Sequence, residues 1–243
     1  MDRGSNIALV IGGSRGIGRA IALRLAREGL DIWLSFKSDQ AAAEQLQADI
    51  KNLGRSCDLL CFDVADHEAT QTALAARASS TPPFAVVFNA GITRDNLLFW
   101  MTPDEWNDVI HTNLGGFYNV MRAVLMPMLA IKQGRIVAIT SVSGEIGQAG
   151  QVNYAASKAG LIGAVKALAR EVGPKKILVN AVSPGIIETE MTHAIQMDKL
   201  RPLIPLQRAG CPEEVAALVQ FLCTEPEMYI HGQVLGVNGG LAM

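Results

Sequence analysis

The sequence of 243 residues predicts an α/β fold in which a parallel sheet of about seven strands carries helices on both faces. Short apolar runs, such as Ile7–Ile11 and Ala85–Phe88, alternate along the chain with longer stretches of helical periodicity. These runs are continuous rather than interrupted by polar residues, which is typical of strands buried on both faces. Right-handed crossovers between such strands predict a Rossmann-like, doubly wound arrangement.

The same pattern assigns each element to a stretch of the chain. Continuous apolar runs predict strands at Ile7–Ile11, Ile32–Phe36, Leu59–Phe62, Ala85–Phe88, Ile136–Thr140, Ile177–Val182 and Val234–Val237. Helical spacing predicts helices at Ile17–Glu28, Gln40–Leu53, His67–Ala78, Pro103 to about Ile131, Tyr154–Val172 and Pro212–Cys223. Thr102 is a suitable N-cap for the long fourth helix, with Pro103 in its first turn. Pro127 should kink or end that helix.

We expect a single domain over residues 1–243, because a chain of this length suits one large α/β unit and shows no repeat or linker. The stretch from Pro184 to about Pro205 has no clear helical or strand pattern. A long structureless insertion in a compact domain usually has a function. We therefore expect a substrate lid at about residues 186–205.

Composition excludes several classes of function. The net charge of −2 gives no sign of a nucleic-acid or membrane-surface binder. We expect a soluble, cytoplasmic protein, because no run of about 18 apolar residues and no signal peptide occurs. The spacing of the four cysteines fits no zinc site, so we expect no metal and favour idle thiols in a reducing cytosol. These cysteines are Cys57, Cys61, Cys211 and Cys223.

A glycine-rich turn, GGSRGIG at residues 12–18, follows the first predicted strand and opens the first predicted helix. Glycines remove the steric barrier to a phosphate, and backbone N–H groups at a helix N-terminus attract an anion. In this strand–turn–helix context, dinucleotide binding is favoured over a plain tight turn. The candidate phosphate-binding residues are Gly12, Ser14, Arg15, Gly16, Ile17 and Gly18.

The end of the second predicted strand indicates which nicotinamide cofactor is used. NAD enzymes of this fold class usually place an acid there for the ribose 2′-OH, whereas here no acid occurs before Asp39. Arg15 and Lys37 are cationic and can neutralise a 2′-phosphate, with Ser35 or Ser38 adding hydrogen bonds. NADP is therefore the expected cofactor, although Lys37 by itself is equally consistent with a solvated surface lysine.

A tyrosine and a lysine one helical turn apart, Tyr154 and Lys158, share one face of the fifth predicted helix. A phenol with a pKa of about 10 is a poor proton donor at neutral pH. The lysine ammonium and an oxidised nicotinamide both favour phenolate, so we expect a lowered pKa for Tyr154 and proton donation to a ketone oxygen. The alternative is an amphipathic helix with one aromatic residue and one snorkelling lysine.

Taken together, three motifs are similar to those of the short-chain dehydrogenase/reductase family. The glycine turn has the spacing Gly-x-x-x-Gly-x-Gly, and Tyr154–Lys158 forms Tyr-x-x-x-Lys. Ser141 ends a predicted strand thirteen residues before Tyr154. The resemblance covers the chain from Ile7 to Met243. Ile11 departs from the usual threonine, and Phe88 departs from the first asparagine of an Asn-Asn-Ala-Gly segment.

The resemblance implies a role for each matching position. Tyr154 is the proton donor, Ser141 orients the substrate carbonyl, and Lys158 also binds the nicotinamide ribose. Asn113 completes the candidate catalytic set by supporting a water that links Lys158 to solvent. The resemblance further implies that Asp63 contacts the adenine and that the segment Ser183–Thr189 faces the nicotinamide. The cofactor-contacting residues that it implies are Asp63, Val64, Asn89, Ala90, Gly91, Tyr154, Lys158, Pro184, Gly185, Ile187 and Thr189.

Within that family the sequence is most similar to the 3-oxoacyl-[acyl-carrier-protein] reductases, at Gly91–Leu98, Asn153–Gly160 and Gly232–Gly240. The resemblance implies NADPH-dependent reduction of a 3-oxoacyl thioester to the 3-hydroxyacyl thioester, in fatty-acid or related polyketide or polyene biosynthesis. It also implies a homotetramer and an acidic acyl carrier protein as partner.

A basic rim would assist the docking of such a carrier. The candidate cations are Lys132, Arg135, Lys175 and Lys176, and ordinary solvated side chains are an equal alternative. The residues Ala155, Ala159, Gly163 and Ala167 form a small-residue helix face. That face permits close packing of a second copy or of the chain's own sheet.

Two other functions remain open. Another reductase or dehydrogenase of the same family, acting on a different ketone or alcohol, would use the same catalytic residues. A catalytically silent NADP-binding sensor or scaffold would keep the glycine turn but lack part of the catalytic set. The presence of all four residues argues against that second alternative.

Overall fold

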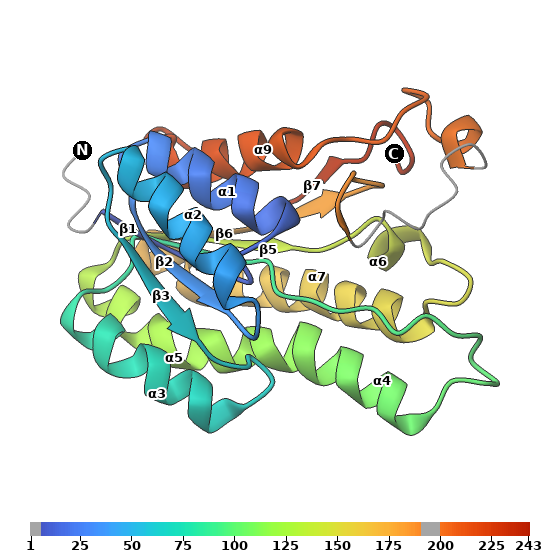
Figure 1. Cartoon of the computed structure of the whole chain (residues 1–243), viewed down its shortest axis with the longest axis horizontal. Coiled ribbons are helices and arrows are strands. Elements are labelled where there is room, and N and C mark those ends of the chain that lie inside the picture. Colours follow the sequence, from blue (N-terminus) through green and yellow to red (C-terminus); the bar gives the residue numbers. More distant parts are fainter. Residues whose placement is uncertain (1–5, 191–199) are drawn as a thin grey trace.

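The computed structural model describes residues 6–190 and 200–243. In these ranges seven strands form one sheet in the order β3-β2-β1-β4-β5-β6-β7, and all neighbouring pairs are parallel (Figure 1). The strands are β1 Ile7–Ile11, β2 Asp31–Phe36, β3 Cys57–Cys61, β4 Ala85–Phe88, β5 Gly134–Ile139, β6 Ile177–Pro184 and β7 Val234–Val237. Successive strands are added on one side of β1 as far as β3 and on its other side from β4 onwards. This reversal of strand order between β1 and β4 confirms the predicted doubly wound fold.

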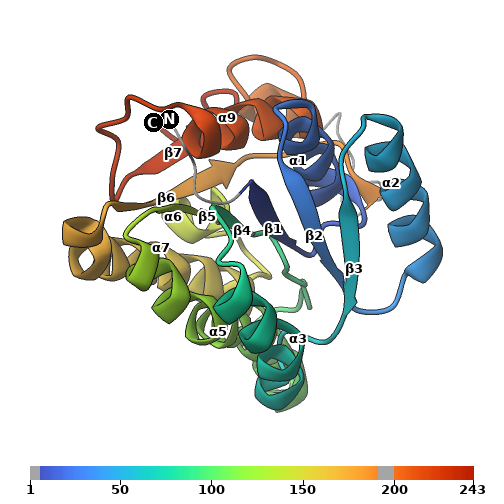
Figure 2. The ribbon, with the colours of Figure 1, turned by 90° about the vertical axis from the view of Figure 1, so that its left-hand side faces the viewer.

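Helices cover both faces of this sheet. In Figure 2, α1, α2 and α9 lie on one side, and α3, α5 and α7 lie on the other. The α-helices are α1 Gly16–Arg27, α2 Gln40–Asn52, α3 His67–Ser80, α4 Pro103–Ile110, α5 Gly116–Ile131, α6 Ser143–Ile146, α7 Val152–Val172 and α9 Pro212–Thr224. The described residues also form a π-helical turn, η1 His111–Gly115, and the 3-10 turns η2 Gly173–Lys175 and η4 Arg201–Leu203.

The two faces of the sheet are each covered by a separate apolar core. Alternate residues of a strand point to opposite faces. Val10 of β1 therefore packs in the cluster that holds Leu25 of α1 and Val219 of α9. Its neighbour Leu9 packs in the other cluster, with Val120 of α5. Burial on both sides explains why the strands are continuous apolar runs.

The long fourth helix begins where the sequence predicts. Thr102 caps α4, because its hydroxyl accepts a hydrogen bond from the Glu105 backbone N–H at 3.2 Å, and the Glu105 carboxylate accepts one from the Thr102 backbone N–H at 2.7 Å. The helix is not regular, however. The π-helical turn η1 separates α4 from α5 and carries the buried Asn113. Such turns occur frequently at functional sites.

Pro127 lies inside α5 and does not end it. The helix continues to Ile131 and stops at Lys132, which has a left-handed φ of 51°. Among the described residues, the combined helix Pro103–Ile131 is long and apolar enough to span a membrane. A buried core helix passes the same test, and Val120 and Val124 of this helix are fully buried in the apolar core.

Part of the expected lid, residues 191–199, lies outside the described residues, as do residues 1–5. The described part before it is attached to the domain, because the Glu188 backbone N–H donates to the Gly210 carbonyl at 2.9 Å. Ile187 is buried against the core of the α1 and α9 face. Both the lid and the single-domain organisation stay predictions.

Candidate active site

The candidate site lies along the carboxyl edge of the sheet. Because all strands are parallel, the segments that follow β1, β4, β5 and β6 leave the sheet at the same edge. Gly12 follows β1, Asn89 follows β4, Ser141 lies two residues beyond β5, and Pro184 ends β6. The fold thus brings together segments that are far apart in the sequence.

The glycine turn is tightly packed at its base. Gly12 and Gly16 have positive φ values of +71° and +50°, which only glycine adopts readily. A Cβ on Gly18 would lie 2.3 Å from the Gly12 carbonyl oxygen. The Asn89 amide donates to that same oxygen at 2.7 Å. Asn89 therefore supports the turn, and no side chain can be added at Gly18 without displacing it.

The exposed side of this turn suits a phosphate. Arg15 is the N-cap of α1 but makes no side-chain cap hydrogen bond, and the first turn of α1 contains no acidic residue. Backbone N–H groups at such an end attract an anion, with help from the helix dipole. Thr189 approaches from the β6 side, because a Cβ on Gly16 would lie 3.3 Å from its Cγ2 atom. The residues present therefore fit a dinucleotide pyrophosphate.

The two cations expected at the 2′-phosphate both lie near the end of β2, where each is paired with acids. The Arg15 guanidinium lies 3.1 Å from the Glu190 carboxylate and 3.8 Å from that of Asp39. The Lys37 ammonium lies 2.6 Å from the Asp63 carboxylate. Burial tends to raise the pKa of Asp63, but hydrogen bonds with Lys37 and Ala65 lower the pKa overall. Exposed pairs of this kind are weak and can exchange partners.

Ser35 has a different role from the expected one. Its side chain is buried, and its hydroxyl oxygen accepts a hydrogen bond from the Gly12 backbone N–H at 3.1 Å. It thus supports the glycine turn from inside, and its predicted contact with a 2′-phosphate is wrong. Ser38 is exposed at the surface beside Lys37. Its predicted hydrogen bond to a 2′-phosphate stays a prediction.

Asp63, which is expected to contact the adenine, and Val64, which is expected to contact the cofactor, follow β3. A buried asparagine that the sequence analysis missed, Asn119 of α5, holds this segment through a 2.8 Å hydrogen bond to the Val64 carbonyl. His67 contacts the Asn119 side chain at 3.0 Å. A polar residue on the apolar face of a predicted helix is the signal that would have pointed to Asn119.

Asn113 clamps the segment after β4 to α7. It is fully buried, accepts a hydrogen bond from the Ile92 backbone N–H at 2.8 Å and donates to the Ile92 carbonyl at 3.1 Å. It also donates to the Ser157 hydroxyl at 3.0 Å. A Cβ on Gly91 would lie 3.3 Å from both Asn113 Oδ1 and Lys158 Nζ, so glycine lets these two side chains converge.

Tyr154 and Ser141 lie close enough for the Ser141 side chain to lower the pKa of the phenol by hydrogen bonding. Burial raises the pKa of Tyr154, and this outweighs the lowering effect of the Ser141 hydrogen bond. The expected acidification of the phenol is therefore absent in the chain by itself. A raised pKa keeps the proton on the hydroxyl, which is the state that a proton donor needs.

Lys158 is buried beneath this pair. Its ammonium donates to the Ile139 carbonyl at 2.8 Å and lies 5.6 Å from the centroid of the Tyr154 ring. Burial lowers the pKa of Lys158 to about 8, so the ammonium form still predominates at neutral pH.

Asn153 is a second residue that the sequence did not single out. Its side chain accepts a hydrogen bond from the Tyr154 backbone N–H and donates to the Arg94 and Glu105 carbonyls.

The segment expected to face the nicotinamide leaves the sheet at Pro184. The Gly185 backbone N–H donates to the Val237 carbonyl at 3.0 Å. A Cβ on Gly185 would lie 2.8 Å from the Cα atom of Asn238, so glycine is required for this contact. The segment thus lies across the ends of β6 and β7 and carries Ile187 and Thr189 toward the glycine turn.

The cations expected to form a carrier-docking rim do not flank this edge within one chain. Lys132 and Arg135 lie at the start of β5, and Lys175 and Lys176 at the start of β6. A strand of this length separates them from Ser141 by about 20 Å. Arg135 is also largely buried, with its guanidinium over the Phe84 ring. The sequence showed only that these residues follow helices, whereas the parallel sheet determines which edge they occupy.

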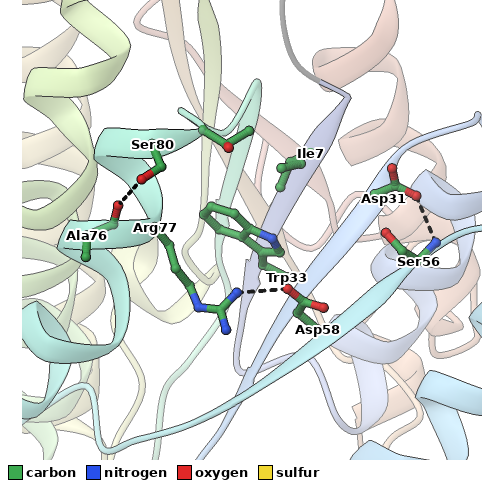
Figure 3. A pocket seen from close by; sticks show the side chains of 9 residues that line it. Ile7, Asp31, Trp33, Ser56, Asp58, Ala76, Arg77 and Ser80 are labelled. Atoms are coloured by element: carbon green, nitrogen blue, oxygen red, sulfur yellow. Dashed lines mark hydrogen bonds and ion pairs between the residues drawn. The ribbon is translucent and has the colours of Figure 1, made fainter.

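A cleft of about 530 Å³ lies away from the candidate site, at the start of β1, β2 and β3 (Figure 3). Trp33 lines it, and the Arg77 guanidinium lies 2.8 Å from the Asp58 carboxylate at its wall. Asp31 accepts a hydrogen bond from the Ser56 backbone N–H and pairs with Arg55. These acids are satisfied by protein partners, and the cleft is not part of the site.

Two of the four cysteines are buried and unreactive, and exposed Cys61 donates to the Lys37 carbonyl at 3.5 Å. Cys57 and Cys223 are buried, and burial raises the pKa of each thiol to about 12, which makes them unreactive. Cys61 is exposed and Cys211 is half-buried. Within residues 6–190 and 200–243, no group of histidine, cysteine and acidic side chains could hold a metal ion.

Comparison with known proteins assigns the family. A family model described as Enoyl-(Acyl carrier protein) reductase matches residues 11–242. The chain belongs to the short-chain dehydrogenase/reductase family. The 3-oxoacyl-[acyl-carrier-protein] reductase FabG of Aggregatibacter actinomycetemcomitans is 48% identical over 240 residues, covering 98% of this chain and 99% of the relative. Those of Pseudomonas aeruginosa and Escherichia coli are 45% and 44% identical over the full length of both chains.

Proposed function

We propose that this chain is an NADPH-dependent reductase that converts a 3-oxoacyl thioester on acyl carrier protein into the 3-hydroxyacyl thioester. The observation that carries this proposal is the hydroxyl pair of Ser141 and Tyr154 with the Lys158 ammonium beneath it, at the edge that bears the glycine turn. The relatives named as 3-oxoacyl-[acyl-carrier-protein] reductases support it, because they match this chain over its full length.

The side chains supply what carbonyl reduction needs. NADPH, when bound, supplies the hydride that is transferred to the substrate carbonyl carbon. The Ser141 and Tyr154 hydroxyls bind the carbonyl oxygen and stabilise the charge that develops there. Tyr154 transfers its proton to this oxygen, so a hydride and a proton are added in total. The fixed charge of Lys158 stabilises the tyrosinate that remains.

Arg15 and Lys37 explain the preference for the phosphorylated cofactor. Both are cationic and exposed near the end of β2, and neither pairs with an acid strongly enough to exclude an incoming 2′-phosphate. Lys37→Ala should raise the KM for NADPH and leave the KM for NADH unchanged. Lys51→Ala is the matched control, because Lys51 is an exposed lysine of α2. Equal effects on both cofactors would reject this role for Lys37.

A homotetramer is supported by surfaces that a single chain leaves uncovered. Ala159, Gly163 and Ala167 are exposed on α7, so the small-residue face does not pack on the chain's own sheet. On α5, Tyr118 and Met126 are 59% and 68% exposed. Small residues let two helices approach closely in a two-fold interface. Gly163→Arg should therefore reduce the mass measured by sedimentation equilibrium. An unchanged tetramer mass would exclude α7 from the interface.

Carrier docking at Lys132 and Lys175 then depends on a second copy. A two-fold axis across α5 places the end of this helix in one protomer near its start in the other. Lys132 and Lys175 would thus approach the partner's catalytic edge. Changing both to Glu should raise the KM for carrier-bound substrate and spare a small free ketone. Equal effects on both substrates would reject docking there.

We also place this activity in the cytoplasm.

The deciding experiment follows NADPH and NADH oxidation with a short 3-oxoacyl thioester, free and carrier-bound. NADPH-dependent turnover that is fastest on the carrier-bound form is expected. A trans-2-enoyl thioester belongs in the same assay, because the family model is described as an enoyl reductase. Preference for the enoyl substrate, for NADH or for an unrelated ketone would overturn the assignment.

A further inference from the structure

The short helix α6 begins two residues after Ser141 and bears directly on that residue. The Ser143 backbone N–H donates to the Ser141 hydroxyl oxygen at 3.2 Å, so the first residue of α6 helps to orient the hydroxyl. A helix of four residues is not stable by itself. The position of α6, and with it the orientation of Ser141, must therefore come from contacts with the rest of the domain.

Two of these contacts join α6 to α7 and to the segment after β4. Gly144 packs against the catalytic helix, because a Cβ there would lie 2.8 Å from the Cβ atom of Lys158. The Ser143 hydroxyl donates to the Gln151 side chain at 3.1 Å, and Gln151 in turn donates to the Asp95 carboxylate at 2.8 Å. These contacts set the distance of α6 from Tyr154 and Lys158.

The third contact joins α6 to β6. The Ser183 hydroxyl donates a short hydrogen bond to the Glu145 carboxylate. Ser183 is fully buried at the end of β6, directly before Pro184 and Gly185. A hydrogen bond to an ionised acceptor is about twice as strong as one between neutral groups. The backbone N–H of Val142, the residue before α6, donates to the Pro184 carbonyl at 3.0 Å. The Glu145–Ser183 hydrogen bond adds a side-chain contact that extends this link into α6 itself.

We propose that Glu145 is a positioning residue, which holds Ser183 and thereby sets the spacing between Ser141 and the segment that faces the nicotinamide. The proposal rests on the proposed function, since that segment matters only when NADPH and substrate meet there. A misplacement of about 1 Å between reacting groups can reduce a rate a hundredfold. The Glu145–Ser183 hydrogen bond therefore acts on turnover rather than on substrate binding.

The test is a double-mutant cycle with Glu145→Ala, Ser183→Ala and the variant that carries both changes. Each single change should lower kcat about tenfold to a hundredfold, with the thioester KM unchanged. NADPH affinity, measured by fluorescence titration, should weaken in parallel. The double variant should be no worse than the worse single variant, because both single changes remove the same hydrogen bond. Glu145→Gln keeps an acceptor oxygen and should retain most of the activity.

Glu68→Ala is the matched control, since Glu68 is an exposed acid in the first turn of α3 and lies outside the site. It should keep the kcat of the unmodified protein. Melting temperatures of all variants separate positioning from loss of folding, since Glu145→Ala leaves the buried Ser183 hydroxyl without its acceptor.

Three results would overturn the proposal: full kcat in both single variants, losses that multiply in the double variant, or equal damage from Glu145→Gln and Glu145→Ala. If the unmodified protein reduces no 3-oxoacyl thioester, the proposed function fails instead. The NADPH titration then decides the role of Glu145 by itself, and unchanged affinity in Glu145→Ala would reject it.

Discussion

The Lys158 ammonium donates a 2.8 Å hydrogen bond to the carbonyl of Ile139, the last residue of β5. This bond ties the helix that carries Tyr154 to the strand that precedes Ser141. The lysine is therefore held by the backbone and lies beside the phenol ring, 5.6 Å from its centroid. Burial removes water from the ammonium and so disfavours its charged form, which explains why the pKa of Lys158 falls to about 8.

Replacing Tyr154 by Phe should abolish most of the turnover. The variant loses the hydroxyl that transfers the proton, and general acid catalysis of this kind contributes about 10²–10⁴-fold. The melting temperature should stay close to that of the unmodified protein, because the ring and its packing remain. Steady-state NADPH oxidation checks the rate. Undiminished turnover would exclude Tyr154 as the proton donor. A catalytically silent NADP-binding sensor or scaffold would then again be an alternative function.

The activity should decline as the pH rises above about 8. Burial lowers the pKa of Lys158 from 10.5 to about 8, and the mechanism uses the charged form. The measurement is kcat/KM from pH 6 to 10 with a free 3-oxoacyl thioester. A flat profile through this range would show that the charge on Lys158 is not needed.

Melting temperatures over the same pH range are the control. Between about pH 8 and 10.5 the unfolded chain binds a proton that the folded chain has released at Lys158. This group therefore makes the folded state more stable as the pH rises through that window. If the activity falls together with the melting temperature, the loss comes from unfolding caused by the titration of other groups.

Asn113→Ala should destabilise the fold as well as the site. The change leaves the Ile92 backbone N–H and carbonyl without the partners they have now. Each buried polar group left unsatisfied costs about 1–3 kcal/mol. We expect a loss of about 2 kcal/mol or more in the free energy of unfolding, measured by urea denaturation. The exposed Asn107→Ala in α4 is the control. Equal stability of the two variants would contradict the clamp.

Gly18→Ala should prevent NADPH binding. The added Cβ would lie 2.3 Å from the Gly12 carbonyl oxygen and 2.6 Å from the Asn89 amide nitrogen, so the turn must move. Lys51→Ala serves again as the control, because Lys51 is exposed near the end of α2 and lies outside the glycine turn. It should bind NADPH with the affinity of the unmodified protein, since it leaves the turn intact. Fluorescence titration with NADPH compares the two, and normal affinity in Gly18→Ala would contradict the packing argument.

The local pattern of the sequence predicts most of the fold. The apolar runs of β1 and β4 match their predicted bounds, and β2 and α2 differ by one residue at an end. Strand and helix periodicities are properties of neighbouring residues, so they can be read without tertiary contacts. The π-helical turn at Asn113 was not predicted, because it depends on the side-chain clamp to Ile92 rather than on local propensity.

By itself the sequence determined the order of strands and helices, the glycine turn, and the face shared by Tyr154 and Lys158, since all three depend on short-range spacing. Only the tertiary structure decided what these residues contact. Ser35 supports Gly12 rather than a phosphate, and Glu145 reaches Ser183 from α6. These partners are separated by 23 and 38 positions in the chain. Such contacts depend on how the parallel sheet places distant segments side by side, which no local pattern encodes.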